Sequence, residues 1–483
     1  MSQQILEGVS SDLWIGGRWR AASDATRFEV QDPATERTIA SVASATVTDC
    51  ISAVDSAQDA FRAWAATAPR ARAEILRRAY ELMIQQSERL ARIITLENGK
   101  SLADARAELS YAAEFFRWNA EEAVRVAGQL SLAPSSGARI LVNHKPVGVA
   151  LLVTPWNFPA AMATRKIGPA LAAGCSVVIK PASATPLTLL ALMPLLEQAG
   201  VPAGVVNLVP SRASGRVVSA MLADPRVRVI SFTGSTEVGR TLLKQAADNI
   251  VRPAMELGGN APFIVFADAD LEAALEGALI AKMRNMGEAC TAANRFYVQA
   301  PIADEFAARL AARMAAMKMG NGLDEGVAVG PLISAEARDK VHELVLDACG
   351  RGARILTGGA PADGPGFFYP PTVLNAVAAN CALVREEIFG PVAAIQSFHS
   401  EDQVLQQANA SEHGLASYVY TADLSRGLRV AERLESGMVG LNRGFVSDPA
   451  APFGGVKQSG LGREGGHEGL LEYLDTQYVS VHW

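Results

Sequence analysis

The sequence has no hydrophobic run long enough to cross a bilayer. Its best candidate, residues 167–179, is short and is interrupted by glycine, proline and serine, whereas a spanning helix needs roughly 20 apolar residues. The first residues also lack a basic region followed by an apolar core, so we expect no signal peptide and no membrane partner. These two absences favour a cytoplasmic protein.

Cysteine and histidine are scarce, and there is no excess of positive charge. The five cysteines are an odd number without a C-x-x-C pair, which argues against a disulfide framework and is typical of the cytosol. The six histidines are scattered, so we expect no catalytic metal bound to the protein. With 44 Lys and Arg against 50 Asp and Glu, the net charge of −6 gives no electrostatic reason to expect nucleic acid as a partner.

Hydrophobic residues, by contrast, make up 49% of the 483 positions, which is enough for large cores. At roughly 150 residues per domain, this length predicts about three domains, or two large ones with a small appendage. Apolar periodicity predicts mostly helix in the first 130 residues, with a third helix over about 102–127. Residues 131–146 are polar around an extended stretch and predict a hairpin that leaves the main body.

From residue 147 onward, short apolar runs alternate with segments long enough for helices. The runs up to residue 256 are VGVALLV, SVVIK, GVVNLV, VRVISFTG and VRPAMEL, and a second series from about residue 261 includes FIVF, RFYVQ, ARILTGG and AAIQSF. Strand–helix–strand alternation predicts right-handed crossovers and doubly wound parallel sheets. The predicted fold class is therefore α/β with two such domains, whose ligands bind at the carboxyl ends of the strands.

Two turns after the first strands of this series carry polar side chains. In the first, two prolines stiffen the loop and Asn157 offers an amide donor, although such an asparagine is by itself more often part of an Asx turn. In the second, Lys180 could meet a ribose or a phosphate, or be merely solvated. The residues of interest in these turns are Thr154, Pro155, Trp156, Asn157, Lys180 and Ser183.

The next two turns combine glycine with polar groups. Gly234 and Ser235 precede a helix, where free backbone N–H groups can meet a pyrophosphate. This turn has only two of the glycines of a G-x-G-x-x-G motif and is equally compatible with a simple helix cap. Glu256 comes just before two glycines, and a carboxylate held in a partly apolar turn can be a general base, although it is more often a structural acceptor.

Cys290 lies where a long helix gives way to a glycine-containing turn. Alone, such a cysteine is more often inert than nucleophilic, and the loop with Glu387 and Phe389 has no clear role in isolation. The combination is more informative. A candidate nucleophile, an acid–base carboxylate and an amide donor fall at turns beside a phosphate-compatible glycine turn, as acyl transfer coupled to a dinucleotide requires.

Six motifs in this order, TPWNFP, KPAS, FTGSTEVG, MELGGN, GEACTAANR and EEIFGP, resemble those of the aldehyde dehydrogenase superfamily. The similarity covers essentially the whole chain, and three longer stretches, among them APFGGVKQSGLGREG, look most like succinate-semialdehyde dehydrogenases. The resemblance implies a dinucleotide-binding domain, a catalytic domain, and a β arm that pairs subunits into dimers or tetramers. We expect these over 1–130 with 147–256, over 257–450, and over 131–146 with 468–483, respectively.

The resemblance also implies catalytic roles. Cys290 matches the nucleophile, whose thiolate attacks the aldehyde carbon, and Asn157 with the Cys290 backbone N–H matches the oxyanion donors. Hydride transfer to nicotinamide then leaves a thioester. Glu256 matches the base that activates water to hydrolyse this thioester, and Lys166 matches the lysine usually found near that base.

Cofactor roles follow by the same matching. Ser235, beside Gly234, matches a pyrophosphate contact, Lys180 an adenine-ribose contact, and Glu387 with Phe389 the grip on the nicotinamide ribose and ring. We assign Thr154, Pro155 and Trp156 to the cofactor as well. Ser183 stands where many NAD-preferring members have glutamate, which would repel a 2′-phosphate. We therefore expect NADP⁺ to be accepted alongside NAD⁺, with the preference open.

The expected substrate is succinate semialdehyde, oxidised to succinate. A distal carboxylate suits the planar fork of arginine, and the resemblance assigns this contact to Arg165, Arg284 and Ser447, although most arginines are solvated or paired with structural carboxylates. Arg443 departs from the pattern and leaves glutarate semialdehyde or a broader range of aldehydes open. Position 292 is alanine, so no C-x-C redox switch is available.

Three other functions are alternatives to this interpretation. In a CoA-acylating enzyme a base for water is dispensable, so Glu256 argues against it. A catalytically silent binding protein would not need the intact set of candidate catalytic residues. A simple thiol esterase would not form NAD(P)H from an aldehyde.

Overall fold

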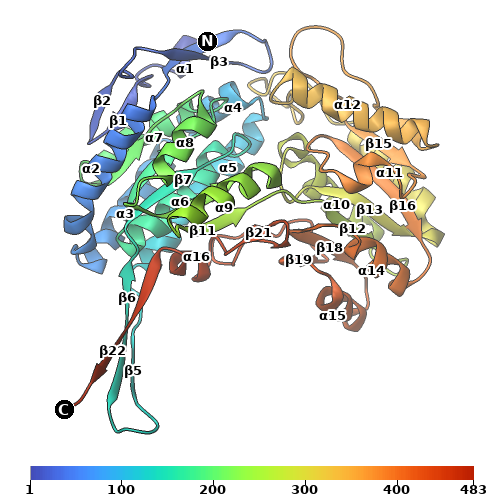
Figure 1. Cartoon of the computed structure of the whole chain (residues 1–483). Helices are drawn as coiled ribbons and strands as arrows, with labels where there is room; N and C mark the ends of the chain where they lie inside the picture. The colour runs from blue at the N-terminus through green and yellow to red at the C-terminus, as the bar shows by residue number, and fades with distance from the viewer. Residues whose placement is uncertain (1) are drawn as a thin grey trace.

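The computed structural model describes residues 2–483 and contains two large sheets, each covered by helices on both faces (Figure 1). The first sheet is built from the five runs predicted before residue 256, each of which contains one strand. These strands are parallel in the spatial order β9 (Val206–Leu208), β8 (Ser176–Lys180), β7 (Val149–Val153), β10 (Val227–Thr233) and β11 (Arg252–Glu256).

The first of these five strands along the chain, β7, therefore lies inside the sheet, and the strand order reverses beside it. The chain goes from β7 to β8 and β9 on one side and returns to β10 and β11 on the other. This reversal between β7 and β10 is a topological switch point, where the loops diverge and leave a crevice for ligands at the carboxyl ends. Three short strands complete the edges: β1 (Leu13–Ile15), β2 (Arg18–Arg20) and β21 (Gly460–Leu461).

Helices bury both faces of this sheet, which is why β7 and β8 are continuous apolar runs rather than alternating ones. One face is covered by α2 (Val47–Ala65), α8 (Ser214–Leu222) and α9 (Thr236–Asp248). The other is covered by α3 (Pro69–Gln85), α4 (Ser87–Asn98), α5 (Leu102–Glu122), α6 (Pro159–Ala173) and α7 (Leu187–Ala199).

The expected end of the third helix is wrong, because α5 stops at Glu122 and not near residue 127. A few residues later, Gly128 packs against the backbone of the arm. A Cβ at Gly128 would lie 2.5 Å from the carbonyl oxygen of Val142. The chain therefore leaves the helix early, because strand pairing in the arm decides the conformation there.

The second sheet has seven strands and begins where the first ends. Six strands run parallel: β15 (Thr372–Asn375), β16 (Val392–Phe398), β13 (Ala293–Gln299), β12 (Ala261–Val265), β18 (Ala416–Tyr420) and β19 (Met438–Leu441). An antiparallel edge strand, β14 (Arg354–Thr357), is added beside β15. The covering helices are α10 (Leu271–Met283), α11 (Ala303–Ala315), α12 (Ala335–Gly350), α13 (Ala382–Arg385), α14 (Glu401–Asn409) and α15 (Leu424–Arg433). The predicted α/β class with two parallel-sheet units is confirmed.

A three-stranded antiparallel sheet projects from the body (Figure 1). It consists of β5 (Gln129–Leu132), β6 (Arg139–Pro146) and β22 (Leu474–Val481), and β22 pairs with β6 along its whole length. The predicted hairpin is thus present and begins two residues earlier, at Gln129. The remaining short elements are α1 (Ser2–Ile5), β3 (Arg27–Gln31), β4 (Thr38–Ala43), η1 (Arg284–Gly287), η2 (Ala300–Ile302), β17 (His413–Gly414), β20 (Val456–Lys457) and α16 (Glu468–Leu471). Between residues 2 and 483, no helix combines the length and apolar character of a membrane span.

Candidate active site

A pocket of about 280 Å³ lies at the carboxyl ends of the first sheet, where the two large sheets meet. The strand ends of β7, β10 and β11 deliver their turns to it, as the topology of a doubly wound sheet requires. Nine of the residues singled out in the sequence line this pocket: Pro155, Trp156, Asn157, Gly234, Ser235, Glu256, Cys290, Glu387 and Phe389.

Cys290 follows a strained turn after α10. Asn285 and Met286 in this turn have φ angles of +51° and +54°, which non-glycine residues keep only where the surrounding contacts hold them. Burial raises the pKa of the Cys290 thiol well above its ordinary value, the nearby Glu256 carboxylate raises it further, and Arg165 opposes both. The thiol is therefore protonated at rest, and it needs a base or a favourable approach of substrate to react as thiolate.

Glu256 is the last residue of β11 and is almost completely buried. Neither oxygen of its carboxyl has a hydrogen-bond partner within residues 2–483. Burial raises the pKa of Glu256 to about 7, against the opposing effect of Arg165. A carboxyl with this pKa changes its protonation state near neutral pH, as a general base for water should.

The glycines after Glu256 allow its turn to approach the cysteine loop. A Cβ at Gly259 would lie 2.4 Å from the backbone carbonyl oxygen of Cys290, so only glycine fits between the two segments. The two-glycine motif therefore has a packing reason. It brings the carboxylate of the first sheet and the thiol of the second into one pocket.

Asn157 presents its side-chain amide at the same place. Its Nδ2 donates to the backbone carbonyl of Glu288 over 3.1 Å, which leaves one amide hydrogen for a ligand beside Cys290. Asn157 therefore does more than close a local Asx turn, which was the alternative interpretation of its sequence position. Its side chain bridges the two large sheets.

Arg165 and Lys166 lie on α6 below Glu256, and both pair with Glu464. The Arg165 Nε is 2.6 Å from a Glu464 oxygen, and the Lys166 ammonium contacts the other oxygen and Ser231. Arg165 Nη2 is 3.9 Å from Glu256. Glu464 was missed in the sequence, because the glycine-rich stretch APFGGVKQSGLGREG that contains it served only for the family resemblance.

The nicotinamide end of the expected cofactor site also falls in this pocket. The Trp156 and Phe389 rings form an edge-to-face pair with centroids 5.4 Å apart. Glu387 accepts a hydrogen bond from the Gly259 N–H over 3.3 Å, and burial raises its pKa to about 7. Phe389 has a φ of +52°, so the turn that presents its ring is also strained.

Ser183, predicted to lie at the adenine-ribose end, lines a neighbouring cavity. This cavity, of about 700 Å³, shares Trp156 with the Cys290 pocket. The buried Lys180 is next to Thr154, whose N–H donates to the Lys180 carbonyl over 3.2 Å. Burial lowers the pKa of Lys180 to about 8. Ser183 is thus separated from Cys290 by Trp156, a separation that an extended dinucleotide would span.

Unsatisfied polar groups test whether a dinucleotide fits here. The buried hydroxyls of Thr154 and Thr233 have no hydrogen-bond partner in the described part of the chain. Ser235 is the N-cap of α9, where its hydroxyl accepts a hydrogen bond from the Val238 N–H, and the N-terminus of such a helix can bind a phosphate. Gly234 must be glycine, since a Cβ would lie 2.5 Å from the Phe232 ring. These features fit a nicotinamide dinucleotide.

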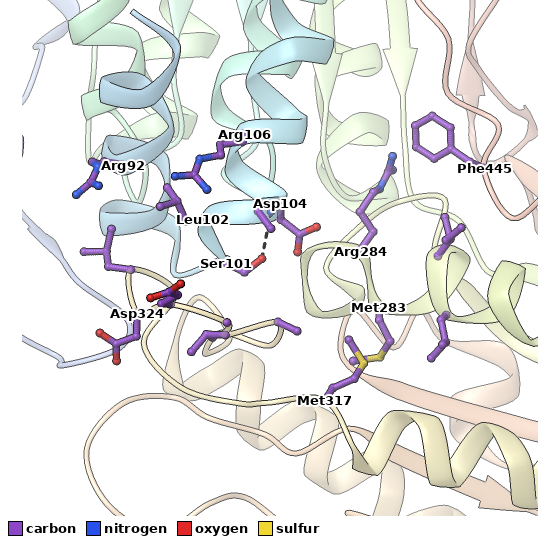
Figure 2. A pocket seen from close by; sticks show the side chains of 18 residues that line it. Arg92, Ser101, Leu102, Asp104, Arg106, Met283, Arg284, Met317, Asp324 and Phe445 are labelled. Carbon is purple, nitrogen blue, oxygen red and sulfur yellow. Dashed lines mark hydrogen bonds between the residues drawn. The ribbon is translucent and has the colours of Figure 1, made fainter.

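Arg284 lines a third cavity, of about 920 Å³, shown in Figure 2. Its guanidinium lies between the rings of Phe158 and Phe445, at 5.1 and 4.8 Å, and Nη2 donates to the Thr291 hydroxyl over 3.2 Å. It has no carboxylate partner within residues 2–483. Of the other expected substrate residues, Ser447 is buried. Arg443 is exposed.

The sequence matches the aldehyde dehydrogenase family over residues 19–479. The chain belongs to this family. It is 56% identical over 443 residues to a succinate-semialdehyde dehydrogenase of Paenarthrobacter nicotinovorans, covering 92% of this chain and 98% of that protein. It is 48% identical to a glutarate-semialdehyde dehydrogenase of Pseudomonas putida, covering 97% of each chain. Its structure matches a crystal structure of an Escherichia coli NADP-dependent enzyme with a TM-score of 0.97 and 47% identity, covering 98% of each.

The expected family, fold and enzyme class are therefore confirmed. As an aldehyde dehydrogenase, the protein oxidises an aldehyde with a nicotinamide dinucleotide. The Cys290 pocket is lined by residues from five of the six motifs that carry the resemblance: TPWNFP, FTGSTEVG, MELGGN, GEACTAANR and EEIFGP.

Proposed function

We propose that this aldehyde dehydrogenase oxidises an aldehyde that carries a distal carboxylate, with succinate semialdehyde as the main substrate. The observation that carries the proposal is the position of Arg284. It is a cation without a carboxylate partner in the described chain, and it contacts Thr291, the residue after Cys290. A substrate with its aldehyde at Cys290 can place a carboxylate against this guanidinium, which binds carboxylates through two parallel hydrogen bonds.

The chemistry proceeds through a thioester on Cys290. The thiolate attacks the aldehyde carbon, and the resulting oxyanion accepts hydrogen bonds from the Asn157 amide and the Cys290 N–H. NAD(P)⁺, when bound, supplies the hydride acceptor. Glu256 then takes a proton from water, which attacks the thioester carbon, and the Cys290 thiolate leaves as the free acid forms.

The remaining assignments follow from the contacts described above. Lys166 acts through its ion pair with Glu464, which keeps the positive charge of Lys166 near Glu256. Ser235, Lys180, Ser183, Thr154 and Glu387 would hold the dinucleotide, with Trp156 and Phe389 at its nicotinamide end. Because Ser183 is neutral, both NADP⁺ and NAD⁺ fit.

A panel of aldehydes tests the substrate assignment. Succinate semialdehyde, glutarate semialdehyde, butanal and benzaldehyde are compared by kcat/KM at saturating NADP⁺. The proposal requires the acids to exceed butanal by at least about tenfold, since a hydrogen bond to a charged group contributes roughly 1.5–3 kcal/mol. A higher value for butanal or benzaldehyde would refute the substrate assignment and leave the enzyme class intact.

Glutarate semialdehyde is the second candidate substrate. The observation in its favour is that the glutarate-semialdehyde dehydrogenase of Pseudomonas putida is 48% identical over nearly the whole chain. It differs from succinate semialdehyde by one methylene group, so the distance between the cysteine and the cation decides between them. The same panel ranks the two acids directly.

We also propose that the arm pairs subunits. Leu130, Leu132 and Tyr478 are each about 60% exposed on its strands, and Trp483 beyond β22 is more exposed still. Such apolar exposure on a projecting sheet suits an interface between copies. Sedimentation velocity should show a dimer or tetramer, and deletion of residues 474–483 should yield smaller species.

A further inference from the structure

A buried ion pair at the start of α5 contacts the loop that carries Asn157. Lys100 Nζ lies 2.6 Å from Glu108 Oε2, and both side chains are fully excluded from solvent. The same Nζ donates to the backbone carbonyl of Asn157 over 2.6 Å and lies 4.1 Å from the centroid of the Phe158 ring. The desolvation of two charges offsets much of their attraction. A pair of this kind is therefore better suited to fixing a geometry than to adding stability.

Glu108 holds the segment that follows this loop. Its Oε1 accepts hydrogen bonds from the N–H groups of Ala160 and Ala161 over 2.9 and 3.3 Å. These belong to the first turn of α6, whose N-cap residue Phe158 makes no side-chain cap. Glu108 therefore caps α6 from another helix, and Lys100 orients the carboxylate that does so. The loop before α6 is held at its carbonyl and at its helix end.

The cysteine side of the pocket contacts the same loop. Asn285 Nδ2 donates over 2.9 Å both to the Asn157 carbonyl and to the Glu288 carbonyl. The Asn157 carbonyl thus receives two donors, Lys100 from one large sheet unit and Asn285 from the other. Its position is fixed relative to the turn that leads to Cys290.

That turn is itself held by α5. The N–H of Asn285, whose φ is +51°, donates to the carboxylate of Asp104 over 3.1 Å. Asp104 lies in the first turn of α5, and Figure 2 shows it between Ser101 and Arg284 at the edge of the large cavity. The first two turns of α5 therefore contact both halves of the oxyanion site.

We propose that Lys100 and Glu108 are positioning residues for the oxyanion site formed by the Asn157 amide and the Cys290 N–H. The inference rests on the proposed function, because it requires Asn157 to stabilise the oxyanion on the way to the thioester. Neither Lys100 nor Glu108 lines the pocket that contains Cys290. They act through the Asn157 backbone. Without Lys100 the loop loses one of its two fixed donors, and the amide moves away from the direction in which an oxyanion accepts strongly.

A double-mutant cycle tests this coupling. Single-turnover NADPH formation from succinate semialdehyde is measured for wild type, Lys100→Met, Asn157→Ala and the double variant. Removal of an oxyanion donor slows chemistry by about 10²–10³-fold, and we expect Asn157→Ala to fall in this range. Lys100→Met should slow the wild type by at least about tenfold and the Asn157→Ala enzyme by less than about twofold, because coupled residues are not additive. The Kd for NADP⁺ should not change.

Two further variants separate positioning from stability. Arg72→Met removes another buried cation, which donates to the Ala172 carbonyl at the opposite end of α6. Its effect on the rate, whatever its size, should be the same with and without Asn157. If Lys100→Met does not fold, Lys100→Met combined with Glu108→Gln keeps an oxygen for capping α6 and leaves no unpaired buried charge. This neutral pair should still show the coupling.

The outcomes separate the positioning role of Lys100 from the oxyanion role of Asn157. Equal slowing by Lys100→Met in both backgrounds, or slowing in neither, would overturn the positioning role while the aldehyde oxidation stands. Undiminished NADPH formation in Asn157→Ala would overturn the oxyanion assignment itself, and the positioning role with it.

Discussion

Arg165 forms an ion pair with Glu464, with 2.6 Å between Nε and the carboxylate oxygen. Both side chains are almost completely buried, so this arginine already has an anionic partner within the protein. Arg284 contacts two rings and a hydroxyl. Within residues 2–483 it forms no ion pair, and Asp104 acts on it only through space. Of the two arginines predicted to bind the substrate carboxylate, Arg284 is therefore the one without an ion-pair partner in the described chain, whereas Arg165 contacts Glu464 and lies 3.9 Å from Glu256.

The first prediction concerns Arg284. Arg284→Ala should remove the preference for succinate semialdehyde over butanal and leave butanal oxidation nearly unchanged, because only the acid uses the guanidinium. The measurement is kcat/KM for both aldehydes. Arg106→Ala is the matched control, since Arg106 lines the same outer cavity but pairs with Glu88 at the surface. A preference that survives in Arg284→Ala would show that another cation binds the carboxylate.

The second prediction separates the two chemical steps. Cys290→Ala should abolish NADPH formation without unfolding the protein, because the thiol is required for chemistry while alanine fits its site. Glu256→Gln should keep the first hydride transfer and block hydrolysis, giving a burst of roughly one NADPH per active site. Rapid mixing with succinate semialdehyde measures the burst. Steady turnover without an accumulated acyl-enzyme would show that another group is the base.

The third prediction is a pH dependence of hydrolysis. The pKa of Glu256 is raised to about 7 by burial, and a base must be unprotonated to accept a proton from water. Deacylation should therefore fall as the pH drops through about 7 and level off above it. The test is steady-state kcat with hydrolysis rate-limiting, from pH 6 to 8.5. A profile that stays flat across neutrality would exclude Glu256 as the titrating base.

The fourth prediction concerns the thiol of Cys290. The carboxylate of Glu256 contributes to its raised pKa, so Glu256→Gln should lower this pKa and increase the thiolate fraction at a given pH. The rate of alkylation by iodoacetamide, followed against pH in the apo enzyme, reports it. Thr291→Ser serves as a conservative control beside the cysteine and should leave the midpoint in place. An unchanged midpoint in Glu256→Gln would show that the two groups do not interact.

The sheets and the order of the site could be predicted from the sequence because their signals are local. β7 and β8 are buried on both faces, and their mostly apolar sequences, VALLV and SVVIK, indicate this burial. The turns after these strands could likewise be assigned to the ligand site from topology alone. The family resemblance then supplied roles that the residues alone left open, such as nucleophile against inert cysteine for Cys290.

The contacts that order the site are mostly not local. Lys166 and Glu464 meet although 298 residues separate them, so no pattern in the sequence predicts their pairing. Lys100 and Glu108 are eight residues apart, and in the sequence nothing distinguishes them from surface charges. In the structure both are fully buried. The end of α5 was mispredicted for a related reason, because pairing within the arm overrides the helical pattern before Gly128.

The last prediction concerns the cofactor and Ser183. This residue lines the cavity next to Trp156, near the end of β8, where Lys180 supplies a buried cation. A glutamate there would repel the 2′-phosphate of NADP⁺ and accept hydrogen bonds from the ribose hydroxyls of NAD⁺. Ser183→Glu should therefore lower kcat/KM for NADP⁺ by more than about tenfold, a change of at least 1.4 kcal/mol, and leave the value for NAD⁺ nearly unchanged or higher.

Ser183→Ala is the matched control, since it removes the hydroxyl without adding charge. It should affect both cofactors by less than about threefold, because a single neutral hydrogen bond contributes only about 0.5–1.5 kcal/mol. The kinetic constants are measured with succinate semialdehyde saturating, and the Kd of each dinucleotide is measured independently. Because Ser183 is only half-buried, the repulsion should also weaken at high salt. Equal losses for NAD⁺ and NADP⁺ in Ser183→Glu would show that the 2′-phosphate does not reach this residue, and the cavity beside Trp156 would then have to accommodate another part of the dinucleotide.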